Sequence, residues 1–300
     1  SGISHNNFKL SAGFSSRSKE IPTGAFNTDL KGDVESFDGR YYIEVSYRKE
    51  LKKNSSLLFN SYYDDYSYTG SYPSGGVNYF DASYGRWGGA EIQYYLEAGK
   101  RNIITAGVEY KHVFRSDYKE WDDDSTHFDQ NFPFSFFSLY AQDQVKLAKN
   151  LNFTAGLRYD HYSIFGKSVS PRLALVYRYS TASSLKLLYS EAYRIPNMYE
   201  SYYESYDSHK NNPGIRSERI HTTELAWSHK LTGSFIGSLS LYRFSIIDLI
   251  DQVLDEVDGL TTFTNIGKAT GNGAEYELRY KHPVNKNQAF LSLSLQRTKD

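Results

Sequence analysis

The sequence predicts an all-β protein built as an antiparallel transmembrane β-barrel, and three observations lead to this prediction. Apolar and polar residues alternate along many segments, most clearly at 151–162, where the even positions carry Asn, Thr, Arg and Asp. The connections between these segments alternate between short and long. Tyrosine is abundant, with 28 residues among 300. Because successive side chains of a strand point to opposite faces, the alternation predicts a sheet with one apolar and one charged face.

The predicted strands follow one another without a helical stretch between them. We count about thirteen, many with ~10 residues or more, whereas strands of globular proteins usually have ~5–6. An odd number of strands leaves unpaired backbone groups at two edges, which hydrocarbon does not tolerate. We therefore expect either a fragment of a longer barrel or a count that is off by one. In chain order, the alternation is clearest at 7–14, 40–48, 90–97, 104–111, 137–145, 151–162, 173–177, 185–189, 223–227, 274–281 and 291–295.

The predicted connections form two classes that take turns along the chain. Short turns at one end and long loops at the other are the layout of an outer-membrane barrel, with periplasmic turns and extracellular loops. Small polar residues, Asn and Gly suit the tight hairpins. Short connections are expected at 52–54, 100–102, 148–150, 180–183, 232–234 and 283–287, and long ones, rich in Tyr, Asp, Ser and Gly, at 17–39, 69–83, 117–132, 193–218 and 247–261.

Composition excludes several classes of protein. The chain has 34 Lys and Arg against 35 Asp and Glu, a net charge of -1, so nothing indicates a nucleic-acid partner. The absence of cysteine excludes disulfides, thiol nucleophiles and Cys-based zinc sites. The mean hydropathy is -0.60 and no run of ~18 apolar residues occurs, which excludes a membrane helix but not a membrane barrel, because barrel strands average out to polar.

A soluble β-sandwich or propeller also shows alternation, because one face of each strand lies in the core and the other in water. Strand length, the strict difference between the two classes of connection, and tyrosines at strand ends favour the membrane instead. Tyrosines gather at 62–68, 159–162 and 177–179, where a lipid boundary would favour amphipathic rings. The soluble alternative, a carbohydrate-binding β-protein, would stay monodisperse without detergent.

The charged face predicts a hydrated barrel interior lined by both signs of charge. A hydrophobic core would not accept so many ionised side chains. The residues expected to face this lumen are Arg40, Glu44, Arg48, Glu91, Glu97, Glu109, Arg158, Asp160, Glu224, Glu275, Glu277 and Arg279.

One long segment carries a recognisable series of motifs. Within 185–225, a strand ends in an aromatic–Arg–x–Pro–Asn corner at 193–197, an Asn-Pro follows at 212–213, and the chain returns through Ser-Glu at 217–218 and Glu-Leu at 224–225. This series resembles the barrel of TonB-dependent outer-membrane receptors, and the likeness extends over essentially the whole chain. Residues 265–277 resemble the next hairpin of that family, and 156–160 and 170–172 match the preceding one. Weaker matches lie at 21–24 and 89–91.

The resemblance implies a barrel of about 22 strands, consistent with large plugged transporters. It also implies the outer membrane of a Gram-negative bacterium, with membrane lipid, the protein's own plug domain and the TonB complex as partners. The plug and the final strands are not recognisable, so we expect residues 1–300 to form a partial receptor barrel from which the plug domain is absent. Active transport would then belong to the parent protein.

Aromatic clusters in the long connections could stack on a small-molecule nutrient and hydrogen-bond it. For each cluster, a membrane girdle or packing within the loop is the alternative. Arg194 could brace the corner next to Pro196 through Glu191 or Glu200, and direct contact with substrate is its alternative. The ligand-binding candidates are Tyr72, Tyr79, Arg86, Trp87, Trp121, Tyr199, Tyr202, Tyr203, Tyr206, His209 and Arg216, with Phe80 beside them.

Nothing in the sequence indicates a metal site, a cofactor or an enzyme. The acidic runs at 122–124 and 248–258 are expected to be solvated loops, because their spacing is not that of an EF-hand. The eight histidines form no His-Glu-x-x-His pattern, and no Gly-x-Ser-x-Gly elbow occurs. We therefore predict no catalytic residue, no metal ligand and no resident cofactor.

The leading functional hypothesis is TonB-dependent uptake of a scarce nutrient, such as a ferric siderophore, haem, cobalamin or a glycan. A passive porin or an outer-membrane enzyme of the same architecture is the alternative. A plug sequence encoded upstream of residue 1 would favour uptake.

Overall fold

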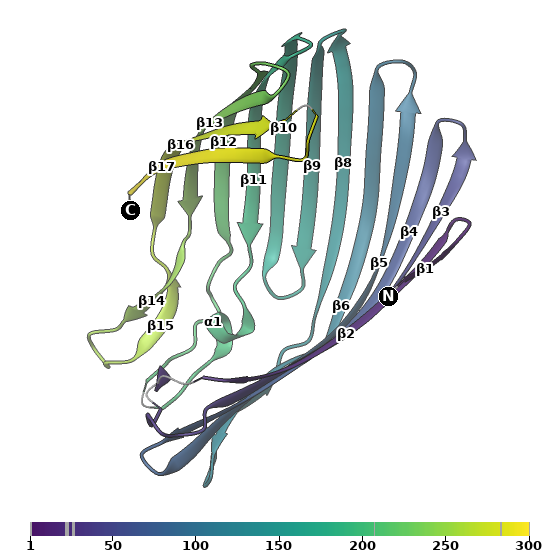
Figure 1. The fold of residues 1–300 in the computed structure, drawn as a ribbon. Helices are drawn as coiled ribbons and strands as arrows, with labels where there is room; N and C mark the ends of the chain where they lie inside the picture. Colours follow the sequence, from purple (N-terminus) through teal and green to yellow (C-terminus); the bar gives the residue numbers. More distant parts are fainter. Residues whose placement is uncertain (1, 22–23, 26–27, 207, 283, 300) are drawn as a thin grey trace.

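The computed structural model describes residues 2–21, 24–25, 28–206, 208–282 and 284–299, and most of them belong to one curved antiparallel sheet (Figure 1). The strands are β1 (Gly2–His5), β2 (Phe8–Glu20), β3 (Glu35–Lys52), β4 (Ser55–Ser74), β5 (Val77–Ala98), β6 (Asn102–Asp122), β7 (Thr126–Asn131), β8 (Phe134–Ala148), β9 (Leu151–Tyr162), β10 (Gly166–Ser180), β11 (Ser183–Arg194), β12 (Glu218–Lys230), β13 (Phe235–Ile247), β14 (Ile250–Leu254), β15 (Thr261–Asn265), β16 (Lys268–Lys281) and β17 (Gln288–Lys299).

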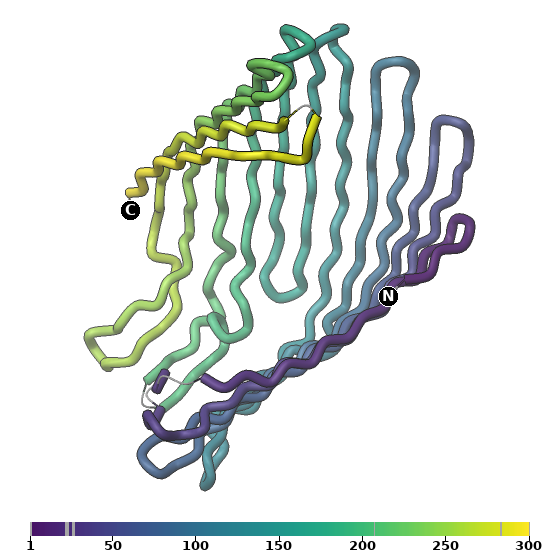
Figure 2. Tube along the Cα trace, in the orientation of Figure 1, coloured from purple at the N-terminus to yellow at the C-terminus, as the bar shows by residue number. Residues whose placement is uncertain are grey.

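The sheet order follows the chain: β1-β2-β3-β4-β5-β6-β8-β9-β10-β11-β12-β13-β16-β17, with β7 paired to β6 at its outer end. Thirteen members of this path, all but β1, have 12 to 22 residues, which confirms the predicted number of long strands. The trace of the sheet curves into an open arc (Figure 2). Within the described residues β1 and β17 do not pair with each other, so the sheet is an open barrel wall.

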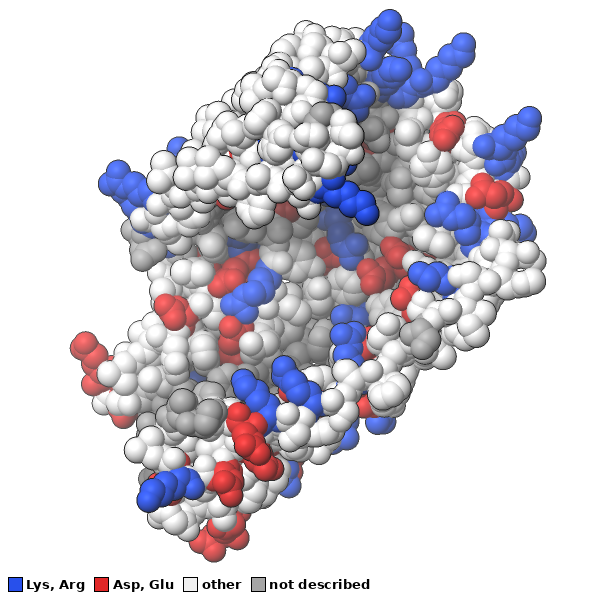
Figure 3. Space-filling model, in the orientation of Figure 1, with Lys and Arg blue, Asp and Glu red and all other residues white. Residues whose placement is uncertain are grey.

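The two faces of this wall have the predicted chemistry. Leu139, Leu157 and Leu187 are 48%, 54% and 49% exposed on the outer face, which a folded core would not allow. Charged side chains of both signs gather in the hollow seen in Figure 3. The strand registers place every predicted lumen residue on this second face, from Arg40 on β3 to Arg279 on β16.

Ion pairs and hydrogen bonds join the lumen side chains across several strands. Arg158 on β9 donates to Asp160 at 2.9 Å and to Glu109 on β6 at 3.1 Å. Glu109 also accepts a hydrogen bond of 3.0 Å from the hydroxyl of Tyr62 on β4. Asp160 is only 1% exposed, and a buried carboxylate is costly unless it is paired with a cation. Arg158 provides that cation.

Glycines allow these long lumen side chains to lie flat on the wall. Tyr140 on β8 crosses Gly107 on β6 to reach Glu91 on β5, with a hydrogen bond of 2.5 Å. A Cβ at Gly107 would lie 2.4 Å from the Tyr140 ring and 2.9 Å from the carbonyl oxygen of Ile92. An aromatic ring packed over a glycine recovers contacts that the missing side chain would have made. The same close approach occurs for Tyr42 over Gly13, Tyr62 over Gly89, Tyr242 over Gly273 and Phe244 over Gly271.

The connections predicted to be tight turns lie at one end of the sheet, but two predicted long loops are wrong. Residues 69–83 and 117–132 are largely strand, because β4 and β5 continue to a hairpin turn at Gly75 and Gly76, and β6 and β7 form a second hairpin. Both glycines have positive φ, of 60° and 86°, as such a turn requires. The polar composition of these segments reflects strands that extend beyond the lipid, where both faces are wet.

The expectation that no helix interrupts the strands is also wrong. A short helix, α1 (Met198–Tyr202), follows β11. Asn197 caps it by accepting a hydrogen bond from the backbone N–H of Glu200, and the Glu200 carboxylate accepts one from the N–H of Asn197. This reciprocal pair satisfies donors that a helix start leaves free. Among the described residues, no helix is long and apolar enough to cross a membrane.

The packing of Tyr140 over Gly107 predicts that a methyl group at position 107 lowers the stability of the barrel. Gly107→Ala is expected to displace Tyr140, break its bond to Glu91 and destabilise the barrel by roughly 1–3 kcal/mol. Urea unfolding of the full-length receptor in lipid vesicles measures this loss. Gly156→Ala is the matched control, because its Cβ would meet no atom closer than 3.5 Å. The control should be neutral or stabilising by about 0.5–1 kcal/mol, and equal losses in the two variants would contradict the packing argument.

Candidate functional site

Two loops fold together at the end of the wall opposite the tight turns. The first runs from 195 to 217 and contains α1, and the second runs from 248 to 267 and contains the hairpin β14–β15 (Figure 1). The amide of Lys210 donates to the carbonyl of Thr261 at 2.9 Å, which ties the two loops. A tilted strand needs only about 9–11 residues to cross a bilayer, so the outer parts of β4, β5 and β6, with 20 to 22 residues each, extend beyond the lipid toward these loops.

The corner that leads into the first loop is braced by charge. Arg194 donates to Glu218 at 2.7 Å and to Glu200 at 2.8 Å. Glu200 is therefore one of the two partners expected from the sequence, while Glu191 instead accepts a hydrogen bond from Tyr189. Because the same Glu200 caps α1, the ion pair fixes the direction in which the loop leaves the strand.

Aromatic rings from β6, β7 and the first loop pack against one another. Tyr199 and Tyr203 stack with centroids 4.4 Å apart, and Tyr118 meets them edge-on at 5.6 and 5.8 Å. Phe128 and His209 lie 5.5 and 5.3 Å from Tyr203. We call these five residues the aromatic cluster. Stacked and edge-to-face pairs of this kind stabilise by about 0.5–1.5 kcal/mol each, so the cluster fixes the loop on the wall.

A cleft of about 720 Å³ opens beside the aromatic cluster. Its walls come from the hairpin β4–β5, from the outer end of β6 and from the first loop. We call it the outer cleft. Its size is in the range of small-molecule sites, about 300–1,000 Å³. The residues that line it are Tyr72, Ser74, Tyr79, Phe80, Asp81, Tyr118, Glu120, Tyr199 and His209.

Two carboxylates lie among the aromatic walls of the outer cleft. Asp81 on β5 and Glu120 on β6 are directly opposite each other in the strand register. Glu120 accepts a hydrogen bond of 2.6 Å from the hydroxyl of Tyr203. Burial raises the pKa of Asp81, and the charge of Glu120 raises it further. Burial likewise raises the pKa of Tyr118 and of Tyr203, so both phenols are neutral hydrogen-bonding groups at physiological pH.

The structure brings several of the predicted ligand-binding residues together. Tyr72, Tyr79, Tyr199 and His209 all line the outer cleft, and Tyr203 lies behind Tyr199. These residues belong to three separate segments of the sequence, and the pairing of the strands is what makes them neighbours.

Other predicted residues lie elsewhere. Arg86 points to the opposite face, where it donates to Asp65 at 2.7 Å. Trp121 stacks on Phe80 at 5.5 Å on that same face. Trp87 follows the lumen face nearer the membrane, where its ring packs against Gly85.

The rest of the predicted residues belong to the loops. Tyr202 stacks on Phe132 at 4.2 Å, which is loop packing. Tyr206 is fully exposed. Arg216 forms an ion pair of 2.6 Å with Asp248. None of the three lines the outer cleft.

Sequence reasoning missed four residues that line the outer cleft: Ser74, Asp81, Tyr118 and Glu120. The segments that hold them had been assigned to loops, where side chains have no predictable direction. Reading 77–84 as a strand would have placed Asp81 on the lumen face, because it shares the two-residue period of Glu91. Tyr118 and Glu120 are out of phase with Glu109, because the register of β5 and β6 shifts between Arg86 and Trp87, so only the strand pairing places them on that face.

Residues of the two acidic runs form hydrogen bonds and ion pairs within the protein. Asp122 accepts hydrogen bonds from the amides of Asp124 and Ser125 and lies 2.8 Å from His127, which lowers the pKa of Asp122 to about 2. Lys210 bridges two aspartates of the second loop, Asp255 and Asp258. Among the residues that the structure describes, no group of three candidate ligands could hold a metal ion.

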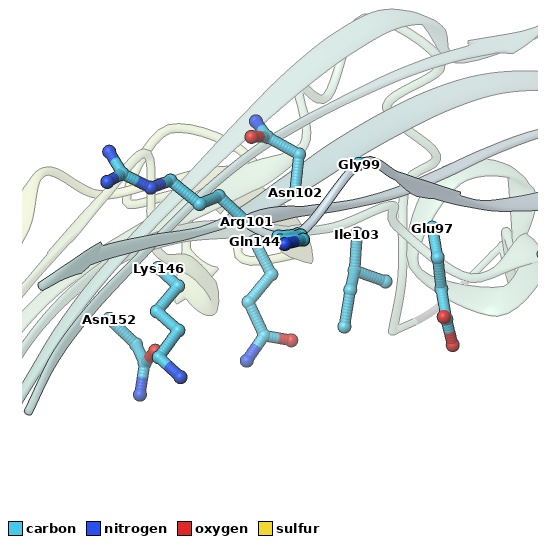
Figure 4. Close-up of a pocket in the computed structure, with 9 residues that line it drawn as sticks. Glu97, Gly99, Arg101, Asn102, Ile103, Gln144, Lys146 and Asn152 are labelled. Atoms are coloured by element: carbon cyan, nitrogen blue, oxygen red, sulfur yellow. The ribbon is translucent and has the colours of Figure 1, made fainter. Parts of the chain in front are cut away.

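A second hollow, of about 290 Å³, lies at the tight-turn end of the wall (Figure 4). It surrounds the turn between β5 and β6, and Glu97, Gln144 and Lys146 extend to one side of it while Arg101 points away. It lacks aromatic side chains and lies at the end opposite the outer cleft. We therefore interpret it as the edge of the hydrated lumen.

The chain matches the family described as TonB dependent receptor-like, beta-barrel, over residues 2–298. It therefore belongs to the TonB-dependent receptor β-barrels, which places it in the outer membrane of a Gram-negative bacterium. The receptor resemblance predicted from the motifs at 193–225 is confirmed.

Curated relatives are receptors and transporters. The chain is 29% identical over 136 residues to the ferric enterobactin receptor of Pseudomonas aeruginosa, covering 41% of this chain and 18% of that protein. It is 35% identical over 65 residues to the ferrienterobactin receptor of Escherichia coli, covering 22% and 9%. It is 25% identical over 143 residues to the vitamin B12 transporter BtuB of Vibrio cholerae, covering 46% and 21%. These matches span about a fifth or less of the length of each relative.

Solved structures share the fold. The outer membrane transporter YddB from Escherichia coli superposes with a TM-score of 0.74 at 14% identity, covering 97% of this chain and 46% of that one. A mutant of the ferric enterobactin receptor from Pseudomonas aeruginosa gives a TM-score of 0.62 at 16% identity, covering 97% and 57%. The chain therefore corresponds to about half of each of these proteins.

The hydrogen bond between Tyr203 and Glu120 predicts that one hydroxyl holds the first loop on the wall. Tyr203→Phe keeps the ring and removes the hydroxyl donor. Losing this hydrogen bond to a charged group should lower the free energy of opening the first loop by about 1.5–3 kcal/mol. Hydrogen exchange of the loop amides in the full-length receptor measures this change. Tyr206→Phe is the control, because Tyr206 is fully exposed. Unchanged protection in Tyr203→Phe would show that the stacking alone holds the loop.

The raised pKa of Asp81 predicts a pH-dependent cost to stability. Its ionised form is disfavoured in the folded state, so folding loses stability as the pH rises from the ordinary aspartate pKa through the higher folded value. Asp81→Asn should therefore raise the urea midpoint of the full-length receptor at pH 7 and lose this advantage near pH 3. A variant that is less stable than the wild type at pH 7 would contradict the assignment.

Proposed function

We propose that the chain is part of the barrel of a receptor that captures a ferric siderophore outside the cell and imports it with energy from the TonB complex. The outer cleft carries this proposal, because it lies at the loop end of a receptor barrel and has the size and the aromatic lining of a small-molecule site. Aromatic faces with hydroxyl groups contact ligands by stacking and by hydrogen bonding together.

The relatives support an iron chelate as the nutrient. Two of them are named for the iron complex of enterobactin, and several of the solved structures are siderophore receptors. Import through a barrel of this kind requires a plug domain that moves, and the charged lumen wall around Arg158 and Glu109 supports a polar partner there. We infer that residues 1–300 form only a partial barrel and that the plug domain belongs to the rest of the parent protein.

The apolar outer face supports membrane lipid as the second partner of the wall. Leu139, Leu157 and Leu187 would contact acyl chains, and hydrocarbon accepts a sheet only when each strand hydrogen-bonds to its neighbours. The receptors and transporters among the relatives favour transport over catalysis as the activity of the parent.

Cobalamin is the second candidate nutrient, because one relative is a vitamin B12 transporter. The two candidates differ in a measurable way. A siderophore receptor supports growth when iron is scarce, whereas a cobalamin receptor supports growth when the cell depends on external cobalamin.

Uptake by the full-length receptor tests the proposal. Cells that lack their other iron receptors should take up radioactive iron chelates only when this receptor and TonB are both present. Tyr199→Ala should weaken chelate binding by roughly tenfold, which corresponds to about 1.4 kcal/mol of lost aromatic contact. Tyr206→Ala is the control and should leave uptake unchanged. Uptake that continues without TonB, or that is restricted to cobalamin, would contradict the proposed siderophore function.

A further inference from the structure

The outer cleft contains two carboxylates, and no described lysine or arginine forms an ion pair with either of them. Asp81 and Glu120 face each other on neighbouring strands, an arrangement that destabilises a sheet when both groups are ionised. Within the described part of the chain, neither forms a salt bridge, and their neighbours are the hydroxyls of Tyr68, Tyr72 and Tyr203. Hydroxyl donors stabilise a carboxylate, but they leave its net charge in place.

The opposite face of the same two strands shows how the protein treats a like-charged pair elsewhere. Arg86 and Arg115 are also directly opposite each other in the register. There each arginine has its own aspartate, since Arg86 pairs with Asp65 at 2.7 Å and Arg115 with Asp117 at 2.5 Å. The hairpin thus neutralises the pair that faces away from the cleft and leaves uncompensated the pair that lines it.

The described arginines and the lysine of the adjoining loops each pair with carboxylates outside the cleft. Arg194 is held by two glutamates, and Lys210 by two aspartates. Arg216 is held by one aspartate, Asp248. Each of these cations therefore has at least one carboxylate of its own, and the described loops carry an excess of negative charge beside the cleft.

We propose that the outer cleft selects a ligand with a positively charged group, which docks between Asp81 and Glu120 against the aromatic rings, and that it rejects polyanionic chelates. This inference rests on the proposed function and specifies the substrate class of the same site. Tyr79, Tyr118 and Tyr199 supply ring faces to the cleft, and ring faces attract cations as carboxylates do.

The chemistry separates this chain from the relatives that are named for enterobactin. An iron complex of three catecholates carries several negative charges. In the partly desolvated cleft, the carboxylates of Asp81 and Glu120 would repel such a complex. A ferric trihydroxamate with a free ammonium group would instead gain two attractive contacts. Charges in contact interact strongly at the effective dielectric constant near a protein surface, so charge can decide between ligands of similar size.

A matched series of ligands isolates charge from shape. Ferrioxamine B is a ferric trihydroxamate with a pendant ammonium group, its N-acetyl derivative is neutral, and its N-succinyl derivative is anionic. Equilibrium binding of all three to the purified full-length receptor should fall in that order, by about tenfold for each step. The double variant Asp81→Asn with Glu120→Gln should bind the three ligands with nearly equal affinity. Asp129→Asn is the control, because Asp129 pairs with Lys119 on the opposite face, and it should keep the preference.

Three results would overturn the inference. The first is an anionic ligand that binds the wild type as tightly as the cationic ligand. The second is a charge preference that persists in the double variant. The third is a receptor that binds none of the three ligands while it still performs TonB-dependent uptake of ferric enterobactin or cobalamin. A receptor that shows the charge preference in binding but no TonB-dependent uptake would instead contradict the proposed function, so the two failures are distinguishable.

Discussion

The two faces of one hydrogen-bonded sheet determine the rest of this structure. Each strand satisfies its backbone groups by pairing with its neighbours, which is the only way a sheet can cross hydrocarbon. The side chains are then divided by position alone: Leu157 is exposed on the apolar outer face, and Arg158 forms ion pairs on the charged inner face. Ionised groups on the inner face are acceptable because they pair across strands, and long tyrosines reach across glycines to join them.

The outer cleft follows from the length of three strands. Because β4, β5 and β6 are longer than a bilayer requires, their outer ends become the wall of a site, and the lumen face of the membrane segment continues as the inner face of that site. The loops complete it through aromatic packing and the bond from Tyr203 to Glu120. The raised pKa of Asp81 means that its ionised form costs stability in the folded protein, a kind of cost that is often found at binding sites.

Alternation was sufficient to predict the antiparallel sheet and its two chemically different faces, because a period of two is a direct consequence of strand geometry. It was insufficient for the site. Residues 69–83 and 117–132 are polar on both faces, and this composition concealed strands that leave the membrane. Asp81 and Glu120 become neighbours only through register, and Arg86 leaves the site for the same reason. The short helix at 198–202 was predictable from Asn197 and Glu200, because an Asn followed three residues later by a Glu is the sequence pattern of a capping box.

The most direct test of this account is the position of the two faces relative to lipid. The chain contains no cysteine, so a single spin label can be placed at 157 or at 154 without competing sites in this segment. In the full-length receptor reconstituted in bilayers, a label at 157 should be accessible to oxygen, which concentrates in lipid, and a label at 154 to a water-soluble nickel complex. The reverse pattern, or equal accessibility of both labels to the nickel complex, would contradict the membrane-spanning wall.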